Sequence, residues 1–193
     1  AFVATERLRS FLYPFVDLLA GIPSVIYGFV GLQVLVKLFL KAGVPTGSCV
    51  LAAGILLAVM LLPFLVSSCC ETMLKEKEKY ELAACALGVS RWYAAATVIL
   101  PASGRNILLS MILAIGRAMG ETMAVIMVAG NQPVIPGSVL AGVRTMTANI
   151  VLEMGYAAGL HREALIATGV VLFVFILIIN VLFSLIKKGD SNG

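Results

Sequence analysis

Two charged side chains, Arg117 and Glu121, lie in the middle of an otherwise apolar segment, residues 107–130. An ionisable group at the centre of a bilayer costs about 2.5–3.5 kcal/mol on insertion scales, and such groups usually mark the path of an ion or a polar solute. A spacing of four residues places both side chains on one face if the segment is a single helix. The pair therefore predicts a helix that lines a path for a polar or anionic solute. The alternative is a buried salt bridge that only fixes helix register.

Two further polar residues are candidates for the same path. Ser110 lies seven residues before Arg117, so a helix would place these two side chains on one face. Asp17 lies in the first apolar segment, where a position at the membrane interface is the alternative. We therefore expect Arg117, Glu121, Ser110 and Asp17 to line the path, although these residues do not identify the solute.

Other kinds of chemistry are not indicated. His161 is the only histidine, and Glu163 close to it makes too few ligands for a metal site. The sequence shows no set of nucleophile, base and orienting group, and no GxxxxGK[ST] loop that holds nucleotide phosphates. We therefore expect a protein that is not an enzyme, has no metal or cofactor of its own, and does not hydrolyse ATP by itself.

The composition indicates that these residues lie in a protein embedded in a lipid bilayer. Of the 193 residues, 61% are hydrophobic and 12% are charged, and the mean hydropathy is +1.05. Soluble domains carry about 25% charged residues and disordered chains carry more, so both classes are excluded. The net charge of +4 is scattered along the chain, which argues against a nucleic-acid partner. The cysteines have no metal-site spacing and are expected as reduced thiols: Cys49, Cys69, Cys70 and Cys85.

Four apolar segments reach the roughly 20 residues that a membrane-spanning helix needs. They cover residues 10–40, 49–70, 107–130 and 164–186. Backbone polar groups in lipid must be satisfied internally, so these segments are expected as helices. The sequence thus predicts an all-α, polytopic transmembrane helix bundle in which residues 1–193 form a single transmembrane domain.

Lysine and arginine residues set the expected orientation. Nine of them fall on one side of the predicted membrane: Arg7, Arg9, Lys75, Lys77, Lys79, Arg91, Arg105, Lys187 and Lys188. Three or four fall on the other: Lys41, Arg144 and Arg162, with Lys37 near a helix end. The positive-inside rule therefore places residues 71–106 and the C-terminus in the cytoplasm and residues 131–163 outside.

Both long connections are expected to contain helix. Residues 71–106 begin with alternating charges and continue as an alanine-rich helix that Gly88 would stop. Ser90 would cap a second short helix that ends near Pro101. In the external connection, we expect a turn at Pro133 and Pro136 and then helix over residues 139–156.

Small residues predict where helices approach closely. Gly116 and Gly120 form a GxxxG pattern that allows contact with another helix. In the first apolar segment, Gly21, Pro23 and Gly28 predict a kinked and closely packed stretch, because proline removes a helix hydrogen bond.

The segment from Glu81 to Pro101 resembles the EAA loop of ABC importer permeases. Matches to that motif are Ala83, Ala84, Gly88, Leu100 and Pro101. Leu82 occupies the position of the motif's glutamate, whereas Glu81 lies one residue earlier. The resemblance implies that this loop contacts a cytoplasmic ATPase.

Three other stretches, residues 21–28, 116–125 and 159–165, are similar to the phosphate-specific importer permeases of the PstC type. The resemblance implies the type I ABC importer permease (MetI-like) fold, with four of about six membrane helices present and two preceding residue 1. It also implies that Arg117 and Glu121 lie on the translocation path of a permease for ATP-driven import of inorganic phosphate.

The same resemblance implies a set of partners in a prokaryotic plasma membrane. They are a second permease subunit of the PstA type, an ATP-binding cassette ATPase dimer that would bind ATP and Mg²⁺, and an extracytoplasmic phosphate-binding protein. Two alternatives stay open: a type I permease for sulfate, molybdate or an amino acid, and an ion-coupled secondary transporter that uses Arg117 and Glu121 as a proton relay.

Overall fold

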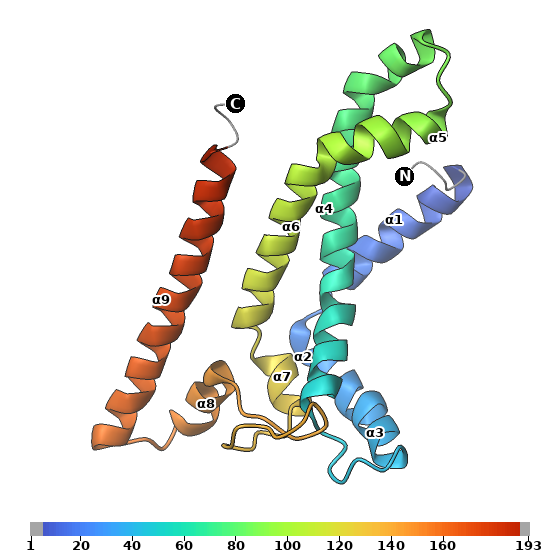
Figure 1. The fold of residues 1–193 in the computed structure, drawn as a ribbon. Coiled ribbons are helices and arrows are strands. Elements are labelled where there is room, and N and C mark those ends of the chain that lie inside the picture. The colour runs from blue at the N-terminus through green and yellow to red at the C-terminus, as the bar shows by residue number, and fades with distance from the viewer. Residues whose placement is uncertain (1–5, 190–193) are drawn as a thin grey trace. The chain divides into compact units, whose positions relative to one another are not determined.

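The structure is a computed structural model that describes the backbone of residues 6–189. Side chains are described for residues 10–181 except Cys85 and Arg91, so Arg7, Arg9, Lys187 and Lys188 also lie outside the described side chains. The described residues form helices joined by loops and contain no strand, which confirms the all-α class (Figure 1). Cys49, Cys69 and Cys70 are free thiols.

The helices fall into two compact units. The first combines α1 (Glu6–Ala20), the second part of α4 (Val50–Ala86), α5 (Arg91–Ala94), η2 (Ala95–Ile99) and α6 (Leu100–Gly120) as far as Ile115. The second combines α2 (Ser24–Gly31), η1 (Leu32–Val36), α3 (Lys37–Lys41), the start of α4, α7 (Met123–Val128), α8 (Met146–Glu153) and α9 (Gly159–Gly189). The chain passes between the units after Gly21, after Met60 and after Ile115.

Four helical stretches of the described chain are long and apolar enough to cross a membrane. They are Ser24–Lys41, Val50–Ala84, Trp92–Gly120 and Gly159–Val181. A membrane protein is therefore the class that length and composition of the helices support.

The first apolar segment is not one spanning helix, contrary to the prediction for residues 10–40. The helix α1 ends at Ala20, and Pro23 takes the extended conformation (φ −57°, ψ 139°) that precedes α2. Proline lacks the N–H that would continue the helix, and it disfavours helical geometry in the residue before it. Only the part after Pro23 is long enough to span.

The second apolar segment continues into the charged connection as one helix, α4, of 37 residues. Beyond its apolar part the helix carries two ion pairs at i,i+4 spacing: Lys75 Nζ lies 2.8 Å from Glu71, and Lys77 Nζ lies 3.6 Å from Glu81. Gly88 then adopts φ +70°, a left-handed conformation that ends helices. Glycine therefore stops this helix where the sequence predicts it.

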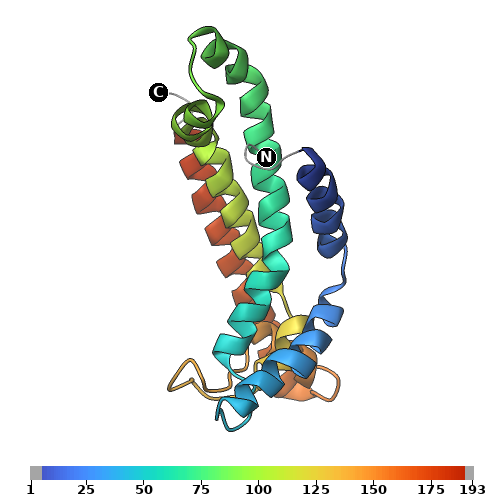
Figure 2. The same cartoon turned by 90° about the vertical axis from the view of Figure 1, so that its right-hand side faces the viewer.

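A sharp hairpin connects α4 to α6. Ser90 Oγ accepts a hydrogen bond from the Tyr93 N–H at 3.3 Å, so Ser90 caps the second arm. This arm does not end near Pro101, contrary to the prediction; α5, η2 and α6 continue as helix through it. The turn η2 is π-helical, and its wider i→i+5 spacing accommodates a residue that has no N–H to donate. Figure 2 shows the two arms of the hairpin side by side.

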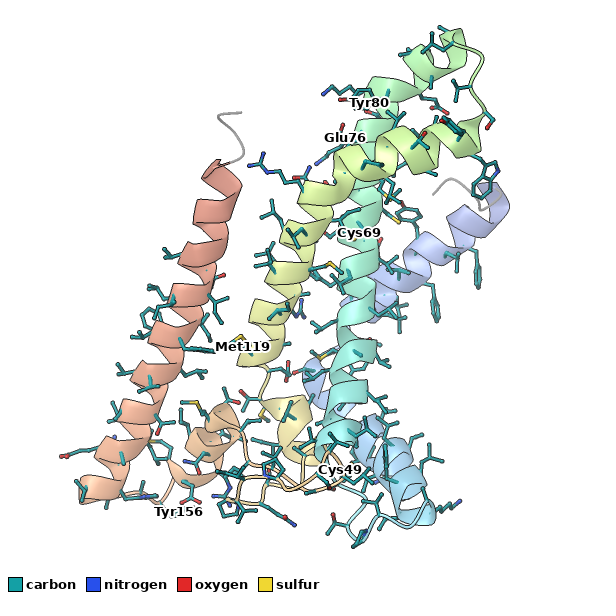
Figure 3. All side chains as sticks on the ribbon, viewed as in Figure 1. Cys49, Cys69, Glu76, Tyr80, Met119 and Tyr156 are labelled. Atoms are coloured by element: carbon teal, nitrogen blue, oxygen red, sulfur yellow. The ribbon has the colours of Figure 1, made fainter. Side chains whose placement is uncertain are left out.

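The connection of residues 131–163 contains less helix than expected: α8 covers only Met146–Glu153 of residues 139–156. The backbone before it is used elsewhere: Val139 and Ala141 accept hydrogen bonds from the Leu51 N–H (2.9 Å) and the Val50 N–H (3.0 Å) at the start of α4. These carbonyls satisfy N–H groups that have no partner within their own helix. The fully buried Cys49 lies at this same end of α4 (Figure 3).

Candidate functional site

The segment that carries the two membrane charges is broken. The helix α6 ends at Gly120 and α7 begins at Met123, so residues 107–130 do not form the single helix that the sequence predicts. Arg117 and Glu121 therefore do not share one continuous helical face. Local hydrogen bonds hold the break: Thr122 Oγ1 donates to the Gly120 carbonyl at 3.1 Å, and Glu121 Oε1 accepts from the Ala124 N–H at 3.1 Å.

Each charge occupies the end of a helix that favours its sign. Arg117 lies in the last turn of α6, with its side chain exposed in this chain. Glu121 is half-buried and its carboxylate caps the first turn of α7. Backbone carbonyls at a helix C-terminus attract a cation, and backbone N–H groups at an N-terminus attract an anion. The two charges thus stabilise the ends that the break creates.

The short helix after the break packs against the start of α4. Gly130, just after α7, approaches the carbonyl oxygen of Ser48 at the start of α4, and Val125 and Ala129 pack with Ala53. The helix α7 therefore ends beside the start of α4. Thr122 lies eight residues before Gly130, which is about 12 Å of helix. The candidate spanning stretch that contains Arg117, Trp92–Gly120, ends directly before the break.

The short helix α7 is held by close packing against α2. A Cβ atom added at Gly28 would lie 2.9 Å from the Ala124 Cα and 2.9 Å from the Met127 Sδ. Only glycine permits this contact between the two backbones. Ala124 and Val128 are fully buried. Neighbouring helices therefore fix the position of the helix that Glu121 caps.

The other glycines singled out in the sequence have different surroundings. Gly21 and Pro23 form the turn between α1 and α2. A Cβ atom added at Gly116 or Gly120 would meet no described atom within 4 Å. Close approach of another helix at these two positions stays a prediction.

Ser110 and Asp17, the remaining candidates for the path, both lie in the first unit. Ser110 is buried, and its hydroxyl lies 2.6 Å from the Ser68 hydroxyl of α4 and donates to the Asn106 carbonyl at 2.9 Å. Asp17 is exposed near the end of α1. Their places on a path stay predictions.

Most motif residues of the segment 81–101 lie around the turn of the hairpin. We define the hairpin tip as residues 82–93. It presents an apolar surface, since Leu82 and Leu87 are 82% and 81% exposed, and Trp92 and Tyr93 are 60% and 61% exposed. Exposed apolar patches of this kind mark interaction sites. Of the other motif residues, Ala84 is buried, whereas Ala83, Leu100 and Pro101 are exposed and Glu81 is half-buried.

A polar network in the second unit was not anticipated from the sequence. Arg144 Nη1 lies 2.6 Å from Glu153 Oε1, and Arg144 Nε donates to the Asn131 carbonyl at 3.0 Å. On the other carboxylate oxygen, Glu153 Oε2 lies 3.1 Å from His161 Nε2. The hydrogen bond from Arg144 lowers the pKa of Glu153, and further bonds from Tyr156 and His161 act in the same direction. The network ties the connection before α8 to α8 itself and to the start of α9.

No sequence pattern indicates this network, because its members are separated by irregular chain. Asn131 turns the backbone with a positive φ of 52°, a conformation that asparagine tolerates better than most residues. Its amide donates to the Ile126 carbonyl at 2.7 Å. Tyr156 lies just beyond α8 at this end of the unit (Figure 3).

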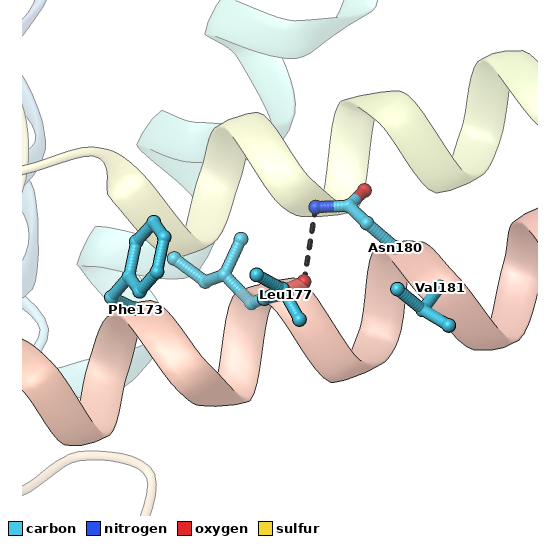
Figure 4. A pocket seen from close by; sticks show the side chains of 5 residues that line it. Phe173, Leu177, Asn180 and Val181 are labelled. Carbon is cyan, nitrogen blue, oxygen red and sulfur yellow. Dashed lines mark hydrogen bonds between the residues drawn. The ribbon is translucent and has the colours of Figure 1, made fainter.

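One surface groove was found along α9, with a volume of about 360 Å³. Its lining comes from one helix: Phe173, Ile176, Leu177, Asn180 and Val181. Asn180 Nδ2 donates to the Ile176 carbonyl at 3.0 Å, so its amide is engaged within the helix (Figure 4). Within the described residues, no three His, Cys, Asp or Glu side chains are grouped closely enough to hold a metal ion.

The long apolar helices indicate a polytopic membrane protein. One of the apolar segments is broken between two charged residues. Residues 1–189 match the family of binding-protein-dependent transport system inner membrane components, and the chain belongs to that family. This is a family of transport-system components and not an enzyme family.

Similarity to individual members of this family extends over most of the chain. It is 38% identical over 191 residues to YqgH of Bacillus subtilis, named as a probable ABC transporter permease protein, with 94% of this chain and 61% of the relative covered. It is 35% identical over 213 residues to the phosphate transport system permease protein PstC of Xylella fastidiosa (99% and 66% covered). The corresponding PstC of Haemophilus influenzae is 33% identical over 206 residues (92% and 64% covered).

The chain thus spans about three fifths to two thirds of the length of these relatives. No solved structure matches the chain.

Proposed function

We propose that this chain is part of the permease subunit of an ATP-driven importer of inorganic phosphate. The observation that carries the proposal is Arg117, a cation in the last turn of α6, directly before the helix break within the apolar segment 107–130. Broken helices at mid-membrane depth are tolerated where they line a cavity, and they form substrate sites in other transporters. The names of the relatives supply the solute, since several are phosphate transport permeases.

In this proposal the two charges have separate tasks. The Arg117 guanidinium attracts the phosphate anion and donates hydrogen bonds to its oxygens. The Glu121 carboxylate accepts a hydrogen bond from the Ala124 N–H, which holds it at the start of α7. Its negative charge lowers the local positive potential, which lets the anion leave after it has entered.

Energy comes from a cytoplasmic partner through the hairpin tip. The apolar surface around Leu82 and Leu87 fits a groove on an ATP-binding cassette ATPase, which binds the ATP and Mg²⁺ itself. This requires residues 71–106 and the C-terminus to be cytoplasmic, the side that the positive-inside rule assigns to them. A second permease subunit completes the path, and an extracytoplasmic phosphate-binding protein delivers the solute to the opposite side.

The test uses the full-length permease, its paired permease, the ATPase and the binding protein reconstituted in proteoliposomes. Uptake of radiolabelled phosphate and ATP hydrolysis are measured together, with sulfate and molybdate as competitors. We expect phosphate with its binding protein to stimulate ATP hydrolysis severalfold, and a tenfold excess of sulfate or molybdate to leave phosphate uptake unchanged.

Two results would contradict the proposal in different ways. Strong competition by sulfate or molybdate would assign the permease to another oxyanion. Phosphate uptake that continues without the ATPase and follows an ion gradient would indicate a secondary transporter.

A further inference from the structure

The two arms of the hairpin are joined by a hydrogen bond between side chains. Ser68 Oγ on α4 lies 2.6 Å from Ser110 Oγ on α6. Because the Ser110 hydroxyl donates to the Asn106 carbonyl at 2.9 Å, the proton between the serines comes from Ser68. The result is a directed chain of two hydrogen bonds that crosses from one helix to the other.

The apolar surroundings of Ser110 offer its hydroxyl few other hydrogen-bond partners. Ser110 is 4% exposed, and its neighbours along the same helix, Ile112 and Ala114, are buried as well. A hydroxyl in an apolar environment loses free energy unless it is hydrogen-bonded. Sliding α4 past α6 by one turn would separate the two serines and break the bond between their hydroxyls. The pair therefore selects one register of the two helices.

The pair lies between the two places that the proposed transport cycle must connect. Along α4, Ser68 is 18 residues before the helix end at Ala86, which is about 27 Å. Along α6, Arg117 follows Ser110 by seven residues, which is about 10 Å of helix. Along α6, the pair therefore lies between the hairpin tip and Arg117.

We propose that Ser68 and Ser110 are positioning residues that make the hairpin move as one rigid body, so that displacement of its tip by the ATPase reaches Arg117 along α6. This inference rests on the proposed coupling of the hairpin tip to an ATPase. It requires that the two helices keep their register throughout the transport cycle.

The first experiment locks the register in the reconstituted full-length complex. Native cysteines are replaced, and Ser68→Cys and Ser110→Cys are introduced together; the 2.6 Å between the hydroxyl oxygens brings the two sulfurs within bonding range. We expect the oxidised complex to import phosphate within twofold of the reduced complex. A loss of tenfold or more on oxidation, restored by reductant, would show that the helices slide and would overturn the proposal.

A second measurement removes the hydrogen bond instead. Ser68→Ala, Ser110→Ala and the double variant are compared for phosphate imported per ATP hydrolysed. We expect each variant to lower this ratio about threefold, with no further loss in the double variant because the partners act as one unit. Ser110→Thr retains a hydroxyl and should restore the ratio. Equal, unchanged ratios in all variants would contradict the proposal.

Ser103 provides the matched control. It is a fully buried serine on α6 whose hydroxyl has no hydrogen-bond partner among the described residues. Ser103→Ala should leave the ratio of phosphate to ATP unchanged. If Ser103→Ala lowers the ratio as much as Ser110→Ala does, loss of packing explains both effects and the proposal fails.

A third readout separates this inference from the proposed solute. The yield of the disulfide in the variant that carries both Ser68→Cys and Ser110→Cys is compared in two states, the nucleotide-free complex and the complex trapped with ATP and vanadate. This comparison needs no phosphate import. Equal yields in both states support a rigid hairpin, and a yield that falls severalfold in one state refutes it. A reduced complex that imports no phosphate would refute the proposed solute alone.

Discussion

The Glu121 carboxylate accepts a hydrogen bond from the Ala124 backbone N–H at 3.1 Å, so an acidic residue within an apolar segment caps a helix. This hydrogen bond explains how the charge of Glu121 is tolerated within the apolar segment, although the helix is interrupted at that point. It satisfies one backbone donor that the helix α7 leaves unpaired and places a negative charge at the positive end of the helix dipole. The cap and the break between α6 and α7 are therefore parts of one feature.

Removing this cap should destabilise the protein in a way that depends on the substituent. Glu121→Ala loses the acceptor and is expected to lower the free energy of unfolding by about 1 kcal/mol. Glu121→Gln keeps a side-chain oxygen that can accept from the Ala124 N–H, so its loss should be clearly smaller. Thermal unfolding in lipid nanodiscs measures both. Equal destabilisation by the two substitutions would mean that the hydrogen bond is not what stabilises α7.

The contact between α2 and α7 should not tolerate a methyl group. Gly28→Ala places a Cβ atom 2.9 Å from the Ala124 Cα, which forces two backbones apart, and the expected cost is about 1–3 kcal/mol. Gly54→Ala is the matched control, because a Cβ atom there meets no described atom within 4 Å and alanine favours helix over glycine. Relative to the wild type, the denaturation midpoint should fall for Gly28→Ala and rise for Gly54→Ala. A neutral Gly28→Ala would contradict the packing.

The network around Glu153 should make stability depend on pH. Hydrogen bonding to Arg144 lowers the pKa of Glu153 in the folded protein, whereas the unfolded chain has a pKa of about 4.3. The carboxylate therefore contributes stability above the unfolded pKa, and this contribution is lost as pH falls through the folded pKa. The difference in Tm between the wild type and Glu153→Gln should be large near pH 7 and shrink below about pH 4.3.

The control for this experiment is Glu163→Gln, which alters an exposed carboxylate near the start of α9. Its Tm should follow that of the wild type at every pH. A Tm difference for Glu153→Gln that stays constant as the pH falls from neutral to well below the unfolded pKa would show that the ion pair with Arg144 contributes nothing.

Polar substitutions at the hairpin tip should weaken association with the ATPase. Leu82→Ser and Leu87→Ser each remove an exposed apolar side chain whose burial on binding is worth about 1.5–3 kcal/mol, or roughly tenfold or more in affinity. Titration of the purified permease pair with the ATPase measures the Kd. Ile135→Ser, which changes a side chain that is 94% exposed in the external connection, should leave the Kd unchanged. Equal Kd values for all three variants would place the ATPase contact elsewhere.

Much of the architecture follows from the sequence because strong local signals decide it. Apolar segments of about 20 residues predict spanning helices, and the stop at Gly88 and the cap at Ser90 follow from backbone chemistry of single residues. The structure has helix over most of these segments, with breaks before Ser24 and after Gly120. The effect of two prolines on their helices was predicted wrongly. The helix ends before Pro23, where it was expected to continue, and it continues through Pro101 after η2, where it was expected to end.

The features that the sequence did not reveal depend on contacts between distant residues. The break after Gly120 is held by α2, α4 and the cap of Glu121, and hydropathy carries no signal for such packing. Residues 139–145 were expected as helix, but carbonyls in this stretch pair with the start of α4 instead. Arg144, Glu153 and His161 meet only because the connection of residues 131–163 folds back on itself. The periodicity of apolar residues predicts helices and strands locally. It does not predict contacts between residues that are far apart in the sequence.

The most direct test of the account is the rate of phosphate uptake by complexes that carry Arg117→Gln or Arg117→Lys at matched protein levels. Hydrogen bonds to a charged group are worth about 1.5–3 kcal/mol, so loss of the guanidinium should reduce uptake about tenfold or more. Arg117→Lys keeps the charge without the planar donors and should fall between the wild type and Arg117→Gln. ATP hydrolysis without solute should be unchanged in both variants. Uptake by Arg117→Gln at the wild-type rate would contradict the assignment of Arg117 to the translocation path.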